Sequence, residues 1–147
     1  MDTTIAAGAL PKRAALTSDP AAQAYLLLRV VFALAPIVFG LDKFAGVLTD
    51  DWTRYLAPQF DDLIPGSAAT AMHLVGIVEI AAGLVVLAAP RFGGLLVAGW
   101  LGGIILNLLL VGGYGDIAMR DAGLLAGALA LSRLAVADRK GSGTIRR

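Results

Sequence analysis

One uninterrupted apolar segment, residues 67–89, constrains the fold more than any other part of the chain. Its sequence is SAATAMHLVGIVEIAAGLVVLAA, about as long as the roughly 20 residues that a helix needs to cross a bilayer. Glu79 lies near its midpoint and is the only glutamate, and His73, the only histidine, precedes it by six residues. Because a carboxylate is costly to bury at that depth, we expect Glu79 to face the other helices.

The composition indicates lipid as the surrounding solvent. Hydrophobic residues make up 58% of the 147 residues and charged residues 16%, whereas about a quarter of a soluble domain is charged. The mean hydropathy is +0.78. With a formal net charge of +1, no overall field favours nucleic acid as a partner.

Four apolar segments of spanning length divide the chain into one domain and two tails. We expect an all-α fold, an integral membrane four-helix bundle over residues 24–136, with spans at about 24–44, 67–89, 92–111 and 116–136. Residues 1–23 are expected to form a mobile cytoplasmic arm, since Pro11 and Pro20 argue against a packed element there. Residues 137–147 are expected to form a basic cytoplasmic tail.

The first connection is expected to be extracellular and to carry a short amphipathic surface helix. Leu48, Trp52, Tyr55 and Leu56 fall on one side at helical spacing, and Trp and Tyr favour the membrane–water boundary. Turns are expected at Pro58 and at residues 65–66. This helix either covers the bundle as a lid or only anchors the connection.

The distribution of basic residues predicts the orientation in a plasma membrane. With four spans, both termini lie on one side, and that side carries Lys12, Arg13, Arg91, Arg133, Arg139, Lys140, Arg146 and Arg147. The opposite connections carry Arg54, Asp50, Asp51, Asp61 and Asp62. The excess of basic residues in cytoplasmic loops places both termini in the cytoplasm.

Gly99, Gly103 and Asn107 step by four residues along one face of the third span. The first two form a GxxxG pattern, which allows helices to pack closely within one chain or between two copies. The sequence therefore leaves open whether the protein forms a homo-oligomer.

Polar residues concentrate in the extracellular half of the predicted bundle. They are Asp42, Lys43, His73, Glu79, Asn107, Asp116, Arg120 and Asp121. The expected structural ion pairs join Asp42 or Asp116 to Arg120, and Lys43 to Asp121, although Lys43 is also expected to extend to the headgroups. Arg29, in the cytoplasmic half, either extends to the headgroups or forms an internal ion pair.

Two interpretations of this polar cluster stay open. In one, Glu79, His73, Asn107 and Arg120 line an outward-facing polar pocket for a quinone headgroup, a polar lipid or a small substrate. In the other, hydrogen bonds among these residues only hold the four helices in register.

The residue content argues against a self-contained enzyme. The chain has no cysteine and one histidine, so it cannot supply thiolate sites or two axial histidines to a haem. Metal-ligand spacing, nucleophile–base sets and phosphate-binding loops are also missing, so we assign no catalytic or metal-ligating residue. We expect no tightly bound cofactor, and a diffusible quinone is the redox molecule that fits.

Three segments resemble the DoxX family of small four-helix bacterial membrane proteins. They are Arg29 with residues 40–44 (GLDKF), residues 76–79 (GIVE) with Gly83, and residues 116–121 (DIAMRD). The resemblance runs over residues 24–136 and implies a four-helix membrane bundle in the bacterial inner membrane. It also implies a redox setting, since the family takes its name from a small subunit associated with a quinol oxidase or a thiosulfate:quinone oxidoreductase.

The leading hypothesis is an accessory subunit that docks to a larger quinone-linked respiratory complex in the membrane. The alternatives are a small proton-coupled transporter with Glu79 as its gate and a stand-alone quinone-dependent oxidoreductase.

Overall fold

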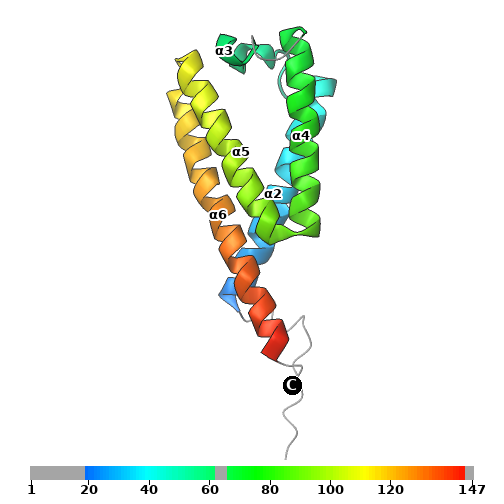
Figure 1. The fold of residues 1–147 in the computed structure, drawn as a ribbon, viewed down its shortest axis with the longest axis vertical. Coiled ribbons are helices and arrows are strands. Elements are labelled where there is room, and N and C mark those ends of the chain that lie inside the picture. Colours follow the sequence, from blue (N-terminus) through cyan, green and yellow to red (C-terminus); the bar gives the residue numbers. More distant parts are fainter. Residues whose placement is uncertain (1–18, 62–65, 145–147) are drawn as a thin grey trace, which may run out of the picture.

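Helices are the only regular elements in the part of the chain that the computed structural model describes, residues 19–61 and 66–144. In chain order they are α2 (Pro20–Ala45), the 3-10 helix η1 (Thr53–Tyr55), α3 (Pro58–Asp61), α4 (Ala68–Ala88), α5 (Pro90–Val111) and α6 (Gly115–Thr144) (Figure 1). This confirms the expected all-α class for the described residues. Three of the helices, α2, α4 and α5, are long and apolar enough to cross a membrane.

Two helices are longer than the apolar segments that predicted them. α2 begins at Pro20, where Asp19 accepts a hydrogen bond from the Ala21 N–H and caps the helix. Residues 1–18 of the expected arm lie outside the described residues, as does residue 65 of the expected turn. α6 continues to Thr144, past the expected end at residue 136, because no proline interrupts its backbone hydrogen bonds.

The four long helices form two pairs. α2 packs along α4, and α5 packs along α6. The pairs converge at the lower end of Figure 1, where α4 turns into α5 at Pro90, and they diverge toward the upper end. Residues 46–61 pass between the pairs at that upper end, so this connection bridges α2 and α4 to α5 and α6.

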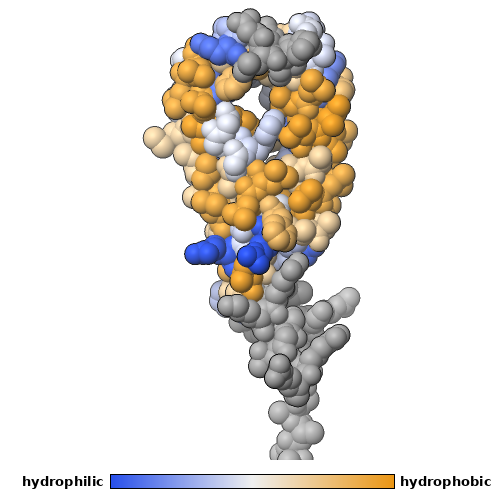
Figure 2. All heavy atoms as spheres, viewed as in Figure 1, coloured by the Kyte–Doolittle hydropathy of each residue, from blue (hydrophilic) through white to orange (hydrophobic). Residues whose placement is uncertain are grey.

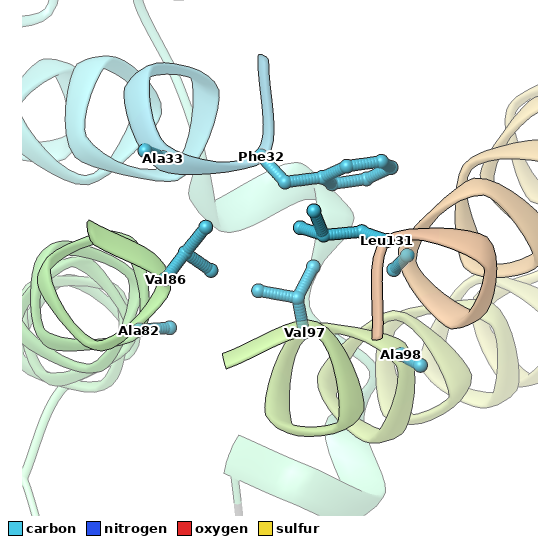
Figure 3. Close-up of a cluster of buried hydrophobic side chains, with 8 residues drawn as sticks. Phe32, Ala33, Ala82, Val86, Val97, Ala98 and Leu131 are labelled. Atoms are coloured by element: carbon cyan, nitrogen blue, oxygen red, sulfur yellow. The ribbon is translucent and has the colours of Figure 1, made fainter. Parts of the chain in front are cut away.

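The apolar core lies where the four long helices converge (Figure 3). Its members are Phe32 and Ala33 of α2, Ala82 and Val86 of α4, Val97 and Ala98 of α5, and Ala128 and Leu131 of α6. Most other large apolar side chains point outward and cover the surface in Figure 2. A surface this apolar is characteristic of a protein surrounded by lipid or by a partner.

Glycines allow α2 and α4 to approach closely. A Cβ atom built at Gly40 would lie 2.6 Å from the Gly76 carbonyl oxygen, and one at Gly83 would lie 2.5 Å from the Ala33 carbonyl oxygen. In contrast, a Cβ built at Gly99 or Gly103 would have no neighbour within 4 Å among the described residues outside the adjacent backbone of α5. The GxxxG pattern of α5 therefore does not pack within the described chain.

The connection between α2 and α4 does not contain the single amphipathic helix expected over residues 48–56. It contains a 3-10 turn and one α-helical turn, which begins at Pro58. One reason is that the N–H groups of Val47, Leu48 and Thr49 bond to the Asp42 carboxylate. The other is that Pro58 disfavours a helical conformation for the residue before it.

Candidate functional site

A buried ion pair joins the two helices of the first pair. The Lys43 ammonium of α2 lies 2.7 Å from the Glu79 carboxylate of α4, and the two side chains are 5% and 9% exposed. A short bond between opposite charges is strong where water is excluded, and separating the charges there is costly. Glu79 therefore faces inward, as expected, with Lys43 as its direct partner.

This pair corrects the expectation that Lys43 would extend to the headgroups or pair with Asp121. The correction follows from the relative depth of the two helices. Gly76 packs against the Lys43 side chain, with a Cβ built at Gly76 lying 3.2 Å from the Lys43 Cβ. Since Gly76 comes about two turns after the start of α4, Lys43 lies deeper than its place near the end of α2 suggests, and its side chain reaches Glu79 one turn further on.

The carboxylate of Asp42 shapes the segment above this pair. α2 ends at Gly46, whose φ of 61° lies in the left-handed region that glycine adopts without strain. The chain then folds back, and Asp42 accepts four hydrogen bonds, from the N–H groups of Val47, Leu48 and Thr49 and from Trp52 Nε1. Asp42 is thus fully occupied by its own connection and forms no ion pair within the described residues.

Trp52 covers the ion pair as a consequence of this folding. Its indole ring lies 4.0 Å from the Lys43 ammonium, a cation–π contact. From Trp52 a series of ring contacts continues through Tyr55 to Tyr114, in the α5–α6 turn. These contacts hold the connection against both helix pairs.

A cavity of about 240 Å³ opens beside the ion pair at the upper end. Its lining residues include Lys43, Phe44, Trp52, Met72 and His73. The His73 imidazole is exposed and stacks on the Phe44 ring with 4.8 Å between centroids. Asp50 and Asp51 lie at its rim, and hydrogen bonds from Thr53 hold the pKa of the Asp51 carboxyl below its usual range.

Asn107 and Arg120, which the sequence placed in the same pocket, have other partners. The Asn107 side chain accepts a hydrogen bond from the Ala57 N–H and donates one to the Tyr55 carbonyl, so it attaches the connection to α5. The Arg120 side chain is 67% exposed, with its Nε 3.5 Å from the carboxylate of the adjacent Asp121. Neither residue lines the cavity, and Glu79 does not line it either, so of the four residues expected in the pocket only His73 does.

Three of the five residues expected in ion pairs form none with another described residue. Asp121 pairs with Arg120 and Lys43 pairs with Glu79, whereas Asp42 bonds to its own connection and Asp116 is exposed at the start of α6. Arg29 donates from Nη2 to the Leu87 carbonyl, at 2.5 Å and in an exposed position, and it pairs with no acid among the described residues. Its extension to the headgroups stays a prediction. A cation at the carboxyl end of α4 is favourable because carbonyls there lack intrahelical partners.

Trp100 of α5 is a residue that the sequence analysis missed. Its indole faces the Glu79 carboxylate from the second helix pair, and its buried Nε1 has no partner of hydrogen-bond geometry among the described residues. Trp100 lies seven residues before Asn107, so helical spacing puts the two on one face of α5. That spacing is the only signal for it in the sequence.

The arrangement offers hydrogen-bond donors and aromatic faces, with no metal-ligand set. No group of three or more His, Asp or Glu side chains among the described residues could hold a metal ion. The ammonium of Lys43 has two further protons beyond the one donated to Glu79. Lys43 and His73 can thus donate to a carbonyl or phosphate oxygen in the cavity while Phe44 and Trp52 supply ring faces.

A comparison with models of protein families found no match for this chain, and neither curated proteins nor solved structures matched it.

Proposed function

We propose that this chain is an integral membrane protein whose upper cavity, beside Lys43 and Glu79, faces the extracellular side and receives a quinone headgroup or a polar lipid headgroup. In this proposal the protein is an accessory subunit of a larger quinone-linked complex in the bacterial inner membrane. The resemblance to the DoxX family supplies the redox setting, and the cavity supplies the binding site.

Insertion into a membrane is supported by the apolar surface of the long helices. Side chains that a water-soluble fold would bury are exposed here, among them Leu27 at 67% and Leu109 at 61%. Three helices have the length and composition of a span. We infer that α6 crosses as well, because it packs along α5 and its residues 122–132 carry no charge.

The observation that carries the binding proposal is the double role of Lys43. Its buried ammonium bonds to Glu79, and Lys43 is also among the residues that line the cavity. A carbonyl oxygen in the cavity would accept a hydrogen bond from an ammonium that Glu79 already holds in place, so little side-chain entropy would be lost on binding. The stacked rings of Phe44 and His73 offer a flat apolar face to a quinone ring.

Asp42 and Asn107 are not part of the binding site that we propose. Asp42 and Asn107 hold the connection in place, so their contacts support the structural interpretation for these two residues. The site that we propose consists of Lys43 and His73, with Phe44 and Trp52 as its walls. Glu79 does not line the cavity and acts by holding the Lys43 ammonium.

Binding is tested by the tryptophan fluorescence of the purified protein in mild detergent, to which Trp52 and Trp100 both contribute. A short-chain quinone is expected to quench the emission saturably in the unchanged chain. His73→Ala, which alters an exposed side chain and should leave the fold intact, is expected to weaken quenching, whereas His73→Phe keeps the stack and should weaken it less. Quenching that rises linearly with quinone and is equal in all three proteins would contradict the proposal.

The accessory role needs a separate experiment. A tagged copy expressed at native level and extracted in mild detergent is expected to bring down a larger oxidase or dehydrogenase. A monodisperse protein without partners would refute the accessory role while leaving the binding proposal to its own test.

A further inference from the structure

A second cavity, of about 290 Å³, lies at the opposite end of the molecule from the first. Its lining residues come from the start of α5 and the later part of α6, two segments that lie near the lower end of Figure 1. Its lining residues are Arg91, Leu95, Leu129, Ser132, Arg133 and Val136. Figure 2 shows hydrophilic side chains gathered at this end of the described molecule, directly below the apolar surface.

The cavity carries the positive charges of two arginines. Arg91 of α5 and Arg133 of α6 are both exposed, and neither forms an ion pair with an acid among the described residues. The Arg91 guanidinium lies 5.6 Å from the centre of the adjacent Phe92 ring, which leaves its N–H groups free to donate. Two guanidinium groups from two helices suit a phosphate, which accepts their hydrogen bonds in pairs.

A buried hydroxyl lies in the same cavity. Ser132 is 5% exposed and lines the cavity together with the two arginines. It can come this close to α5 because Gly94 has no side chain, and a Cβ built at Gly94 would lie 3.0 Å from the Ser132 N. Its hydroxyl is a further donor for an oxygen in the cavity.

The remaining walls are apolar and continue onto the outer surface of the helices. Leu95 is 50% exposed and Leu129 is 42% exposed. One turn beyond Leu95, Gly99 has no neighbour within 4 Å of a built Cβ, so the surface there stays shallow and open. A free phosphate would leave these leucines in contact with water, whereas acyl chains would cover them.

We propose that this cavity binds an anionic phospholipid, with its phosphate at Arg91, Arg133 and Ser132 and an acyl chain along Leu95 and Leu129. The inference rests on the membrane insertion proposed above and is independent of the ligand in the upper cavity. It agrees with the expected orientation, because basic pockets between helices on the cytoplasmic side meet the anionic leaflet.

The test is native mass spectrometry of the full chain released from nanodiscs of equal parts phosphatidylglycerol and phosphatidylcholine. We expect one phosphatidylglycerol to be retained per chain in preference to phosphatidylcholine. Replacing one arginine, as Arg91→Gln or Arg133→Gln, is expected to lower that preference about fivefold, and both together about 25-fold.

Two further variants separate a built site from general attraction. Arg54→Gln removes an exposed arginine at the upper end and is expected to leave the preference unchanged. Leu129→Trp fills the cavity without altering charge and is expected to lower retention of the lipid. An unchanged preference in the Arg91→Gln/Arg133→Gln protein, or an equal loss in Arg54→Gln, would overturn the inference.

The outcomes also distinguish this inference from the proposed function. A chain that is not recovered in nanodiscs would refute membrane insertion, and with it both proposals. An inserted chain without preference for phosphatidylglycerol would refute the lipid site alone.

Discussion

Lys43 and Glu79 lie 36 residues apart in sequence, and their charged groups meet at 2.7 Å inside the contact between α2 and α4. Both side chains are more than nine-tenths buried. Each charge is therefore compensated by the other. The pair joins α2 to α4, and Lys43 also belongs to the proposed binding site.

Replacing either member of this pair with an uncharged residue is expected to lower the stability of the protein. Glu79→Gln or Lys43→Met leaves one buried charge without a partner, and each should lower the free energy of unfolding by about 3–5 kcal/mol. The double variant should lose less than the sum of the two, because no lone charge remains. Thermal unfolding in detergent measures all three, with Asp116→Asn, an exposed acid changed to its amide, as the matched control.

Asp42→Asn is expected to loosen the connection without unfolding the helices. Val47 and Leu48 donate to one carboxylate oxygen of Asp42, and Thr49 and Trp52 donate to the other. An asparagine has a single acceptor oxygen, so one of these two sets must lose its partner. Hydrogen exchange at the amides of residues 47–49 should accelerate at least about tenfold, equivalent to about 1.4 kcal/mol. Unchanged protection at all three amides would contradict the role given to Asp42, and Asp50→Asn is the control.

The effect of a glycine-to-alanine substitution on stability should depend on which atoms lie beside that glycine. Gly76→Ala places a methyl group 2.7 Å from the Gly40 carbonyl oxygen, and it should lower stability by about 1–3 kcal/mol because α2 and α4 must separate. Gly99→Ala meets open space, and it should raise stability by up to about 1 kcal/mol through helix propensity. If Gly76→Ala and Gly99→Ala changed the thermal stability equally, α2 and α4 would not be in close contact at Gly76.

Asn107→Leu is expected to detach the connection from α5. The substitution removes the acceptor of the Ala57 N–H and the donor to the Tyr55 carbonyl, which should cost about 1–3 kcal/mol. Faster exchange at the Ala57 amide, with no change within α4, is the expected pattern. Slow exchange at Ala57 in the variant would show that other contacts hold the connection.

The helices could be predicted from the sequence, because their cause is local. An apolar segment of spanning length indicates a helix whatever its neighbours are, and α4 (Ala68–Ala88) begins and ends within one residue of the expected segment. The extension of α6 to Thr144 was missed because the polarity of its last residues says little about backbone hydrogen bonding.

The partners of the polar residues could not be predicted in the same way. The Lys43–Glu79 pair depends on how far α2 and α4 are displaced along each other, and the contact of Gly40 with Gly76 sets that displacement. Asp42, next to Lys43 in sequence, turns to its own connection because Gly46 reverses the chain beside it. Such relationships are set by packing between helices, which spacing within one helix does not reveal.

Labelling of single cysteines tests whether the cavity beside Lys43 opens to the outside of a membrane that the long helices cross. The chain has no native cysteine, so Asp50→Cys at the rim of the upper cavity and Arg91→Cys at the opposite end each give one reactive site. With a membrane-impermeant maleimide on intact bacteria, Asp50→Cys should be labelled and Arg91→Cys should react only after the membrane is permeabilised. Labelling of both in intact cells, or of Arg91→Cys alone, would contradict the account.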